Sequence, residues 1–126
     1  MASKKPNAFN PPSVPKPPPT YSQVCVTPIV VSSALVTLAG QTGLQKDDTV
    51  PSGIKAQAKA GYEIIHKCLE AADAKDVVER GWGEEWIEFM DQKADGHRPP
   101  DTVVGVASLP LGKLLYECEV TAMICR

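Results

Sequence analysis

The sequence lacks the features that most directly identify a function. Its 126 residues include only two histidines and four cysteines, and the formal net charge is -2. This near-neutral balance gives no long-range attraction to nucleic acid or to an anionic membrane surface. The longest apolar candidate, residues 25–38, is interrupted by serine, threonine and proline, so no membrane span is expected. Nucleic-acid-binding and membrane-spanning classes are therefore not expected.

The cysteines also lack a recognisable pattern. They show no CxxC motif and no Cys/His ligand spacing, which speaks against a zinc site, and we expect neither a metal nor a cofactor. No apolar segment follows the lysines near the N-terminus, so a secretory signal is not expected and a reducing, cytoplasmic compartment is. We expect the cysteines to be buried apolar residues or unreactive thiols. They are Cys25, Cys68, Cys118 and Cys125.

Proline is concentrated at one end of the chain. Residues 1–20 hold seven of the twelve prolines and no acidic residue, which predicts an extended or disordered tail without a packed core. The run Pro17-Pro18-Pro19 favours polyproline II, so a proline-motif ligand and an inert leader are both open. Residues 21–126 are long enough for a single domain with a core of its own.

Two stretches rich in β-branched residues open this domain. Residues 22–27 and 29–38 are predicted strands with a break at Pro28. The second ends in Ala39-Gly40-Gln41-Thr42-Gly43, where two glycines indicate a turn with positive φ or a close approach of the backbone.

Helical periodicity follows. Apolar residues at three- and four-residue steps predict a helix from about residue 53 to 72, with Ser52 as its N-cap. Val77, Val78 and Trp82 indicate a short strand. Residues 84–92 have helical spacing and acidic residues in front, as the helix dipole prefers.

The stretch 98–120 predicts a hairpin around a corner at residues 109–112. Its first strand contains Val103, Val104 and Val106, and residues 114–122 alternate between apolar and polar, as in a strand with one wet face. Glu117 and Glu119 therefore share a face.

The element order is thus β-β-α-β-α-β-β, an α+β fold with a mixed sheet and both helices on one face. The opposite face has no helix left to cover it. Burial against other subunits would cover it, so oligomerisation is expected.

This order and four local motifs resemble the Rid family, also called YjgF-like or L-PSP endoribonuclease-like. The motifs are Tyr21-Ser22-Gln23-Val24, the turn 39–43, the helix end Leu69-Glu70-Ala71-Ala72, and residues 104–110 followed by 116–120. The resemblance implies a chorismate-mutase-like fold assembled as a homotrimer, with small-molecule sites in the clefts between subunits.

The resemblance also implies a site, and one departure from it. In the deaminating members an arginine grips the substrate carboxylate, and Asp101 stands at its position here; Arg98 is the nearest replacement. The serine of the family's turn is Ala39, whereas Tyr21, the Gly40 backbone and Glu119 match. We expect Glu119, Asp101 and Tyr21 to be catalytic. The expected substrate-binding residues are Gly40, Ala39, Gln41, Thr102 and Arg98.

A carboxylate in place of a guanidinium argues against the usual 2-imino acid deaminase activity. A pair of carboxyl groups suits tautomerisation, cyclisation or hydrolysis of a carbonyl, enamine or imine metabolite, in secondary metabolism for example. Two alternatives stay open: a non-catalytic small-molecule-binding or regulatory protein, and a deaminase with an anion clamp rebuilt around Arg98. RNA cleavage is suggested only by the family's older name, and nothing basic lines the expected site.

Overall fold

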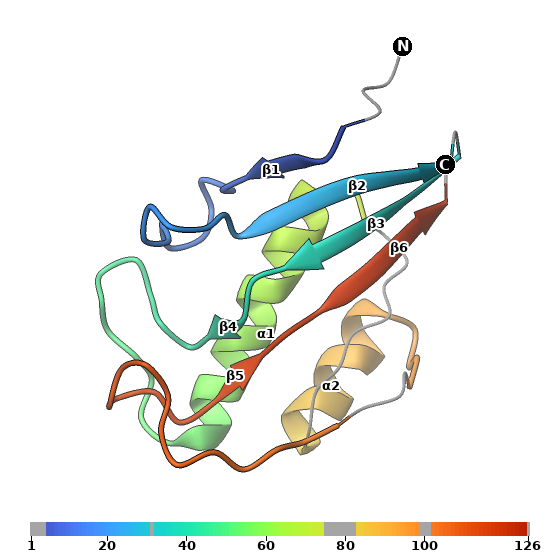
Figure 1. The fold of residues 1–126 in the computed structure, drawn as a ribbon. Helices are drawn as coiled ribbons and strands as arrows, with labels where there is room; N and C mark the ends of the chain where they lie inside the picture. Colours follow the sequence, from blue (N-terminus) through green and yellow to red (C-terminus); the bar gives the residue numbers. More distant parts are fainter. Residues whose placement is uncertain (1–4, 31, 75–82, 99–101, 126) are drawn as a thin grey trace.

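The computed structural model describes residues 5–30, 32–74, 83–98 and 102–125. Strands β1, β2, β3 and β6 form a four-stranded sheet in that order, β4 and β5 form a separate two-stranded ribbon, and α1 and α2 lie on one face (Figure 1). This α+β arrangement confirms the predicted fold class. The elements are β1 (Asn7–Phe9), β2 (Val24–Val30), β3 (Ser33–Leu38), β4 (Gln41–Thr42), α1 (Ile54–Ala71), α2 (Glu84–Lys93), β5 (Glu117–Cys118) and β6 (Thr121–Cys125).

All strand pairs within the described residues are antiparallel. The mixed character that the sequence predicted is therefore not seen there. The strand predicted at Val77, Val78 and Trp82 lies outside the described residues. In the centre of the sheet, Val36 of β3 pairs with Val26 of β2 and Ala122 of β6.

The core lies between the sheet and the helices. Alternate residues of the strands, including Val24, Val36 and Ala122, are buried against the helical layer, as the two-residue period of a strand requires. Within α1, Cys68 is fully buried, and this burial raises the pKa of its thiol to about 11. A thiol that stays protonated at neutral pH is a packing residue and not a nucleophile.

Helix α1 follows the predicted limits closely, but its N-cap does not. The cap residue is Gly53, with φ of 85°, and no side chain caps the helix, so the prediction of Ser52 was wrong. Glycine adopts this left-handed φ without the steric cost that serine would meet. At the other end Asp73 has φ of 58° and the Ala74 N–H donates to the Leu69 carbonyl, which closes the helix where the sequence predicted.

Helix α2 is also as predicted, with Glu84 and Glu85 in its first turn. It buries Trp86, Phe89 and Met90 against α1. In the part of the chain that the structure describes, neither helix has the length and apolar character needed to cross a membrane.

Pro28 does not break β2, contrary to the prediction. It lies inside the strand and pairs with Ala34, and the register shifts between Pro28 and Val30. Strand β1 pairs only with residues 24–26. Pro28 therefore lies beyond the end of β1. Its lack of a backbone N–H costs no hydrogen bond between β2 and β1.

The predicted C-terminal hairpin is only half correct. The alternation is confirmed, with Cys118, Val120 and Ala122 buried and the residues between them exposed. Residues 102–106, however, form no strand, and their three valines are exposed. The valine segment was expected to pair with the strand at residues 114–122. That part of the chain pairs elsewhere, because β5 pairs with β4 and β6 pairs with β3.

The proline-rich stretch lies against the domain instead of apart from it. Residues 7–9 form β1 on the edge of the sheet, and Val14 is part of the core. Gln23 holds this segment against the domain through two hydrogen bonds. Its backbone N–H donates to Asn10 Oδ1 (2.9 Å), and its Nε2 donates to the Pro15 carbonyl (3.2 Å). The difference from the expected tail arises from pairing with residues far along the chain.

Candidate functional site

Three segments meet where the large sheet passes into the small ribbon. The Ala39 N–H donates to the Gln23 carbonyl (2.9 Å), and the Leu38 N–H donates to the Val120 carbonyl (3.1 Å). These bonds bring together residues 21–23, 38–42 and 117–120, which we call the ribbon corner. Five of the predicted site residues belong to it, namely Tyr21, Ala39, Gly40, Gln41 and Glu119.

Gly40 is the point of closest approach in the ribbon corner. A Cβ built at this position would lie 2.1 Å from Oε1 and 2.8 Å from Cδ of Glu117. The Glu117 carboxylate therefore lies directly over the Gly40 Cα, and any side chain at position 40 would displace it. This is the close approach that the glycine in the turn predicted.

Two carboxylates consequently flank Gly40. The β4–β5 register ends at Gln41–Cys118, and the β3–β6 register continues to Leu38 and Val120, so Ala39 and Gly40 together lie opposite Glu119. The prediction placed Glu117 on the same face as Glu119 but left it out of the site. The signal that would have included it is the pairing of β4 with β5, which a local pattern does not show.

Gln41 supports the turn from inside. Gln41 is only 3% exposed, and its Nε2 donates to Gln23 Oε1 (2.7 Å) and to the Ala39 carbonyl (2.8 Å). These bonds fix the backbone that carries Ala39 and Gly40. Gln41 therefore shapes the ribbon corner through its neighbours.

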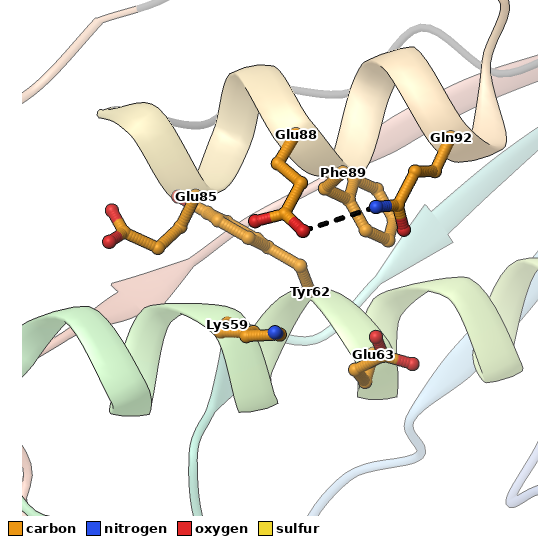
Figure 2. A pocket seen from close by; sticks show the side chains of 7 residues that line it. All are labelled: Lys59, Tyr62, Glu63, Glu85, Glu88, Phe89 and Gln92. Carbon is orange, nitrogen blue, oxygen red and sulfur yellow. Dashed lines mark hydrogen bonds between the residues drawn. The ribbon is translucent and has the colours of Figure 1, made fainter.

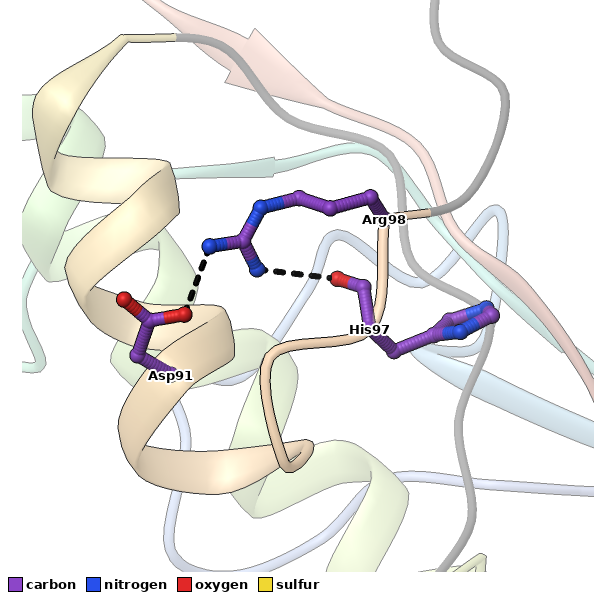
Figure 3. Close-up of polar contacts among 3 residues, drawn as sticks. All are labelled: Asp91, His97 and Arg98. Atoms are coloured by element: carbon purple, nitrogen blue, oxygen red, sulfur yellow. Dashed lines mark hydrogen bonds and ion pairs between the residues drawn. The ribbon is translucent and has the colours of Figure 1, made fainter.

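Arg98 is held elsewhere. Its guanidinium donates to Oδ1 of Asp91 on α2 (2.6 Å) and to the His97 carbonyl (3.2 Å), as Figure 3 shows. Thr102 is exposed. Asp101 lies outside the described residues, so its role stays a prediction. The structure thus does not bring Arg98 to the ribbon corner.

The electrostatics of the ribbon corner are acidic. Lys113 donates to the Asp48 carbonyl and not to either glutamate. Over the described ranges, no ion pair joins Glu117 or Glu119 to a basic side chain. A cationic or neutral group is favoured here over an anion.

An apolar wall lies behind β5, on the side of the helices. The hydroxyl groups of Tyr116 and Tyr62 are hydrogen-bonded to each other at 2.8 Å, and the Tyr62 ring packs on Trp86 and Phe89. Burial first, and then the hydrogen bond shared with Tyr62, raise the pKa of Tyr116 well above its usual range. Tyr116 therefore stays neutral and serves as support for β5.

A hollow lies between α1 and α2, and Figure 2 shows its lining. Charged side chains from both helices surround it, and Glu88 accepts a hydrogen bond from Gln92 at 3.1 Å. It contains none of the predicted site residues. Elsewhere in the described chain, too, no three His, Cys, Asp or Glu side chains gather as a metal site would require. The hollow is lined by Lys59, Tyr62, Glu63, Glu85, Glu88, Phe89 and Gln92.

The sheet, the ribbon and the two helices on one face define an α+β protein of the YjgF type. No family model matches the sequence and no curated protein matches it, so the likeness rests on solved structures. Yeast Mmf1 is 22% identical over 97% of this chain and 100% of its own, with a TM-score of 0.71. RidA from an Antarctic Psychrobacter is 26% identical over 90% of this chain and 94% of its own, with a TM-score of 0.61.

Escherichia coli TdcF, solved with bound serine, is 20% identical over 90% of this chain and 94% of its own, with a TM-score of 0.66. The chain therefore has the fold of the YjgF, L-PSP and Rid proteins. The resemblance that its sequence motifs indicated is confirmed.

Proposed function

We propose that the chain acts on a small carbonyl, enamine or imine metabolite that has no carboxylate, by acid–base chemistry at the ribbon corner. The observation that carries this proposal is the Glu117 carboxylate over Gly40, with Glu119 beside it. Arg98 is the only arginine among the described residues, and its guanidinium is bound to Asp91 and not to the ribbon corner. Like-charge repulsion from the Glu117 and Glu119 carboxylates opposes the binding of a substrate carboxylate.

The two acids and Tyr21 divide the chemistry of imine hydrolysis between them. The carboxylate of Glu117 favours the protonated imine, C=NH2⁺. Glu119 accepts a proton from water as the water oxygen bonds to the imine carbon and the π electrons move to nitrogen. Glu119 then returns the proton to nitrogen. As the C–N bond breaks, the hydroxyl proton of the carbinolamine passes to Glu119 and from there to solvent, so ammonia and a neutral carbonyl compound leave. Tyr21, which is 49% exposed, donates a hydrogen bond to the developing oxygen.

Two imines that differ only by a carboxylate test the proposal. Benzylamine and a flavin amine oxidase generate PhCH=NH, and phenylglycine and a flavin amino-acid oxidase generate its carboxylated analogue. Ammonia release is measured with and without the protein. We expect the uncharged imine to be accelerated about tenfold more than its analogue, which corresponds to about 1.4 kcal/mol. Faster hydrolysis of the carboxylated imine would contradict the proposal and would favour a deaminase whose clamp is rebuilt around Arg98.

The homotrimer belongs to the same proposal. The sheet face opposite the helices carries Met123, which is 54% exposed and pairs with the half-buried Leu35. Apolar side chains on a sheet face favour burial against another surface. Subunits that meet there would shield the ribbon corner from water.

We expect light scattering to give three times the chain mass of 13.5 kDa. Met123→Glu should shift the protein to the monomer mass, because a buried charge without a partner is costly. Thr121 is exposed on the same face of β6, so Thr121→Glu tests whether a negative charge anywhere on that face dissociates the trimer. A monomeric wild-type protein would contradict this part of the proposal.

A non-catalytic binder is the second candidate, because Tyr21 and Glu119 are exposed and the solved TdcF structure holds serine, a small molecule. Binding of an imine analogue at the ribbon corner without turnover of either imine would favour it. Action in secondary metabolism and a cytoplasmic location stay predictions.

A further inference from the structure

Gln57 is a polar residue on the buried face of α1. It is only 2% exposed, and its amide has a full set of backbone partners. Nε2 donates to the carbonyls of Pro51 (3.1 Å) and Lys113 (3.0 Å), and Oε1 accepts from the Leu115 N–H (2.8 Å). A buried amide satisfied in this way fixes the segments that it binds, because breaking one bond leaves a buried group unpaired.

The side-chain bonds fix the segment that leads into β5, and the backbone of Gln57 packs on the residue that follows β4. Leu115 lies two residues before Glu117, the first residue of β5. On the other strand, Gly43 directly follows β4, and a Cβ built on Gly43 would lie 2.9 Å from the Gln57 Cα and from its carbonyl oxygen. Gln57 therefore touches the chain just outside both β4 and β5.

We propose that Gln57 is a positioning residue that holds β4 and β5 together so that Glu117 lies over Gly40. The consequence for catalysis rests on the proposed function, whereas the positioning itself does not. A shift of about 1 Å between reacting groups lowers turnover roughly 100-fold. Loss of the Gln57 bonds should therefore lower kcat about 100-fold and change KM much less.

The variant Gln57→Met keeps the length and apolar fit of the side chain and removes all three bonds. Gln92→Met is the matched control, because Gln92 is exposed and its amide binds Glu88 on its own helix. The first readout is the nuclear Overhauser effect between Gly40 Hα and Glu117 Hγ. The second is the chemical shift of the Gly40 amide across the range in which glutamates titrate, about pH 3 to 6.

We expect both signals in the wild type and in Gln92→Met, and their loss in Gln57→Met, while the contacts between Tyr62 and Trp86 persist. Retention of both signals in Gln57→Met would overturn the proposal. If that variant fails to fold, Gln57→Glu keeps the acceptor for Leu115 and removes only the donated bonds, with the same expected loss.

The unmodified protein provides an independent check. The Gln57 side-chain amide and the Leu115 N–H should exchange with solvent slowly, and exchange as fast as that of the Gln92 amide would refute the positioning role. If the wild type turns over neither imine, the proposed function fails, but the Gly40–Glu117 signals still decide the role of Gln57.

Discussion

Gly43→Ala is expected to lower the free energy of unfolding by about 2 to 3 kcal/mol, the upper part of the range for overpacked sites. The added Cβ would meet the Gln57 Cα and carbonyl oxygen at 2.9 Å, closer than real Cβ contacts allow. Both atoms are backbone atoms of α1, so neither side chain rotation nor a small local shift relieves the clash. Urea unfolding at one protein concentration measures the change.

Gly61→Ala is the matched control, because it adds the same methyl group to the same helix-ribbon contact. Its Cβ would lie 3.5 Å from the Thr42 carbonyl carbon, an ordinary packing distance. Alanine inside a helix is favoured over glycine by about 1 kcal/mol, so this variant should be more stable than the wild type. If Gly43→Ala were as stable as the wild type, the close packing of β4 on α1 would be wrong.

Glu119→Gln is expected to lower the rate of PhCH=NH hydrolysis at least about 100-fold, the usual minimum for loss of a general base. An amide has nearly the shape of the carboxylate but does not accept the proton of the attacking water. Because Glu119 is exposed, stability should change by less than about 0.5 kcal/mol. Initial rates of ammonia release and urea unfolding on the same samples separate the two effects.

Glu88→Gln is the control for this substitution, since it makes the same change at an exposed position of α2 outside the ribbon corner. Its rate should equal that of the wild type. Unchanged turnover by Glu119→Gln, or equal losses in the two variants, would remove Glu119 from the mechanism.

Local periodicity was sufficient for much of the fold. The apolar stripe predicted α1, and the acidic residues ahead of an apolar face predicted α2. The alternation around Cys118 and Val120 correctly divided buried from exposed residues. These patterns depend on neighbours three, four or two positions away, which the sequence displays directly.

Strand partners could not be predicted in the same way. The valines before Gly105 have strong β-propensity, yet β5 and β6 pair with strands some 80 residues earlier in the chain. Val14 enters the core from a proline-rich segment for the same reason, because β1 pairs with β2. Propensity is local, whereas the choice of partner is settled by tertiary packing.

The candidate site, like the fold, could be predicted only where the signal was local. Gly40 and Glu119 were predicted from motifs, and the glycine turn correctly indicated a close approach at Gly40. Glu117 and Gln57 were missed, because their importance comes from the β4–β5 register and from bonds to residues 56 and 58 positions away. A glutamine on an otherwise apolar helix face was the available signal for Gln57.

The central claim is that the ribbon corner receives a positively charged C=N group and not a carboxylate. Benzamidinium, a stable cation with the shape of protonated PhCH=NH, and benzoate, its anionic counterpart, test this in one nuclear magnetic resonance titration of the wild-type protein. We predict saturable shifts of the Gly40, Glu117 and Glu119 resonances with benzamidinium and none with benzoate. Shifts of these resonances with benzoate, and not with benzamidinium, would contradict the account.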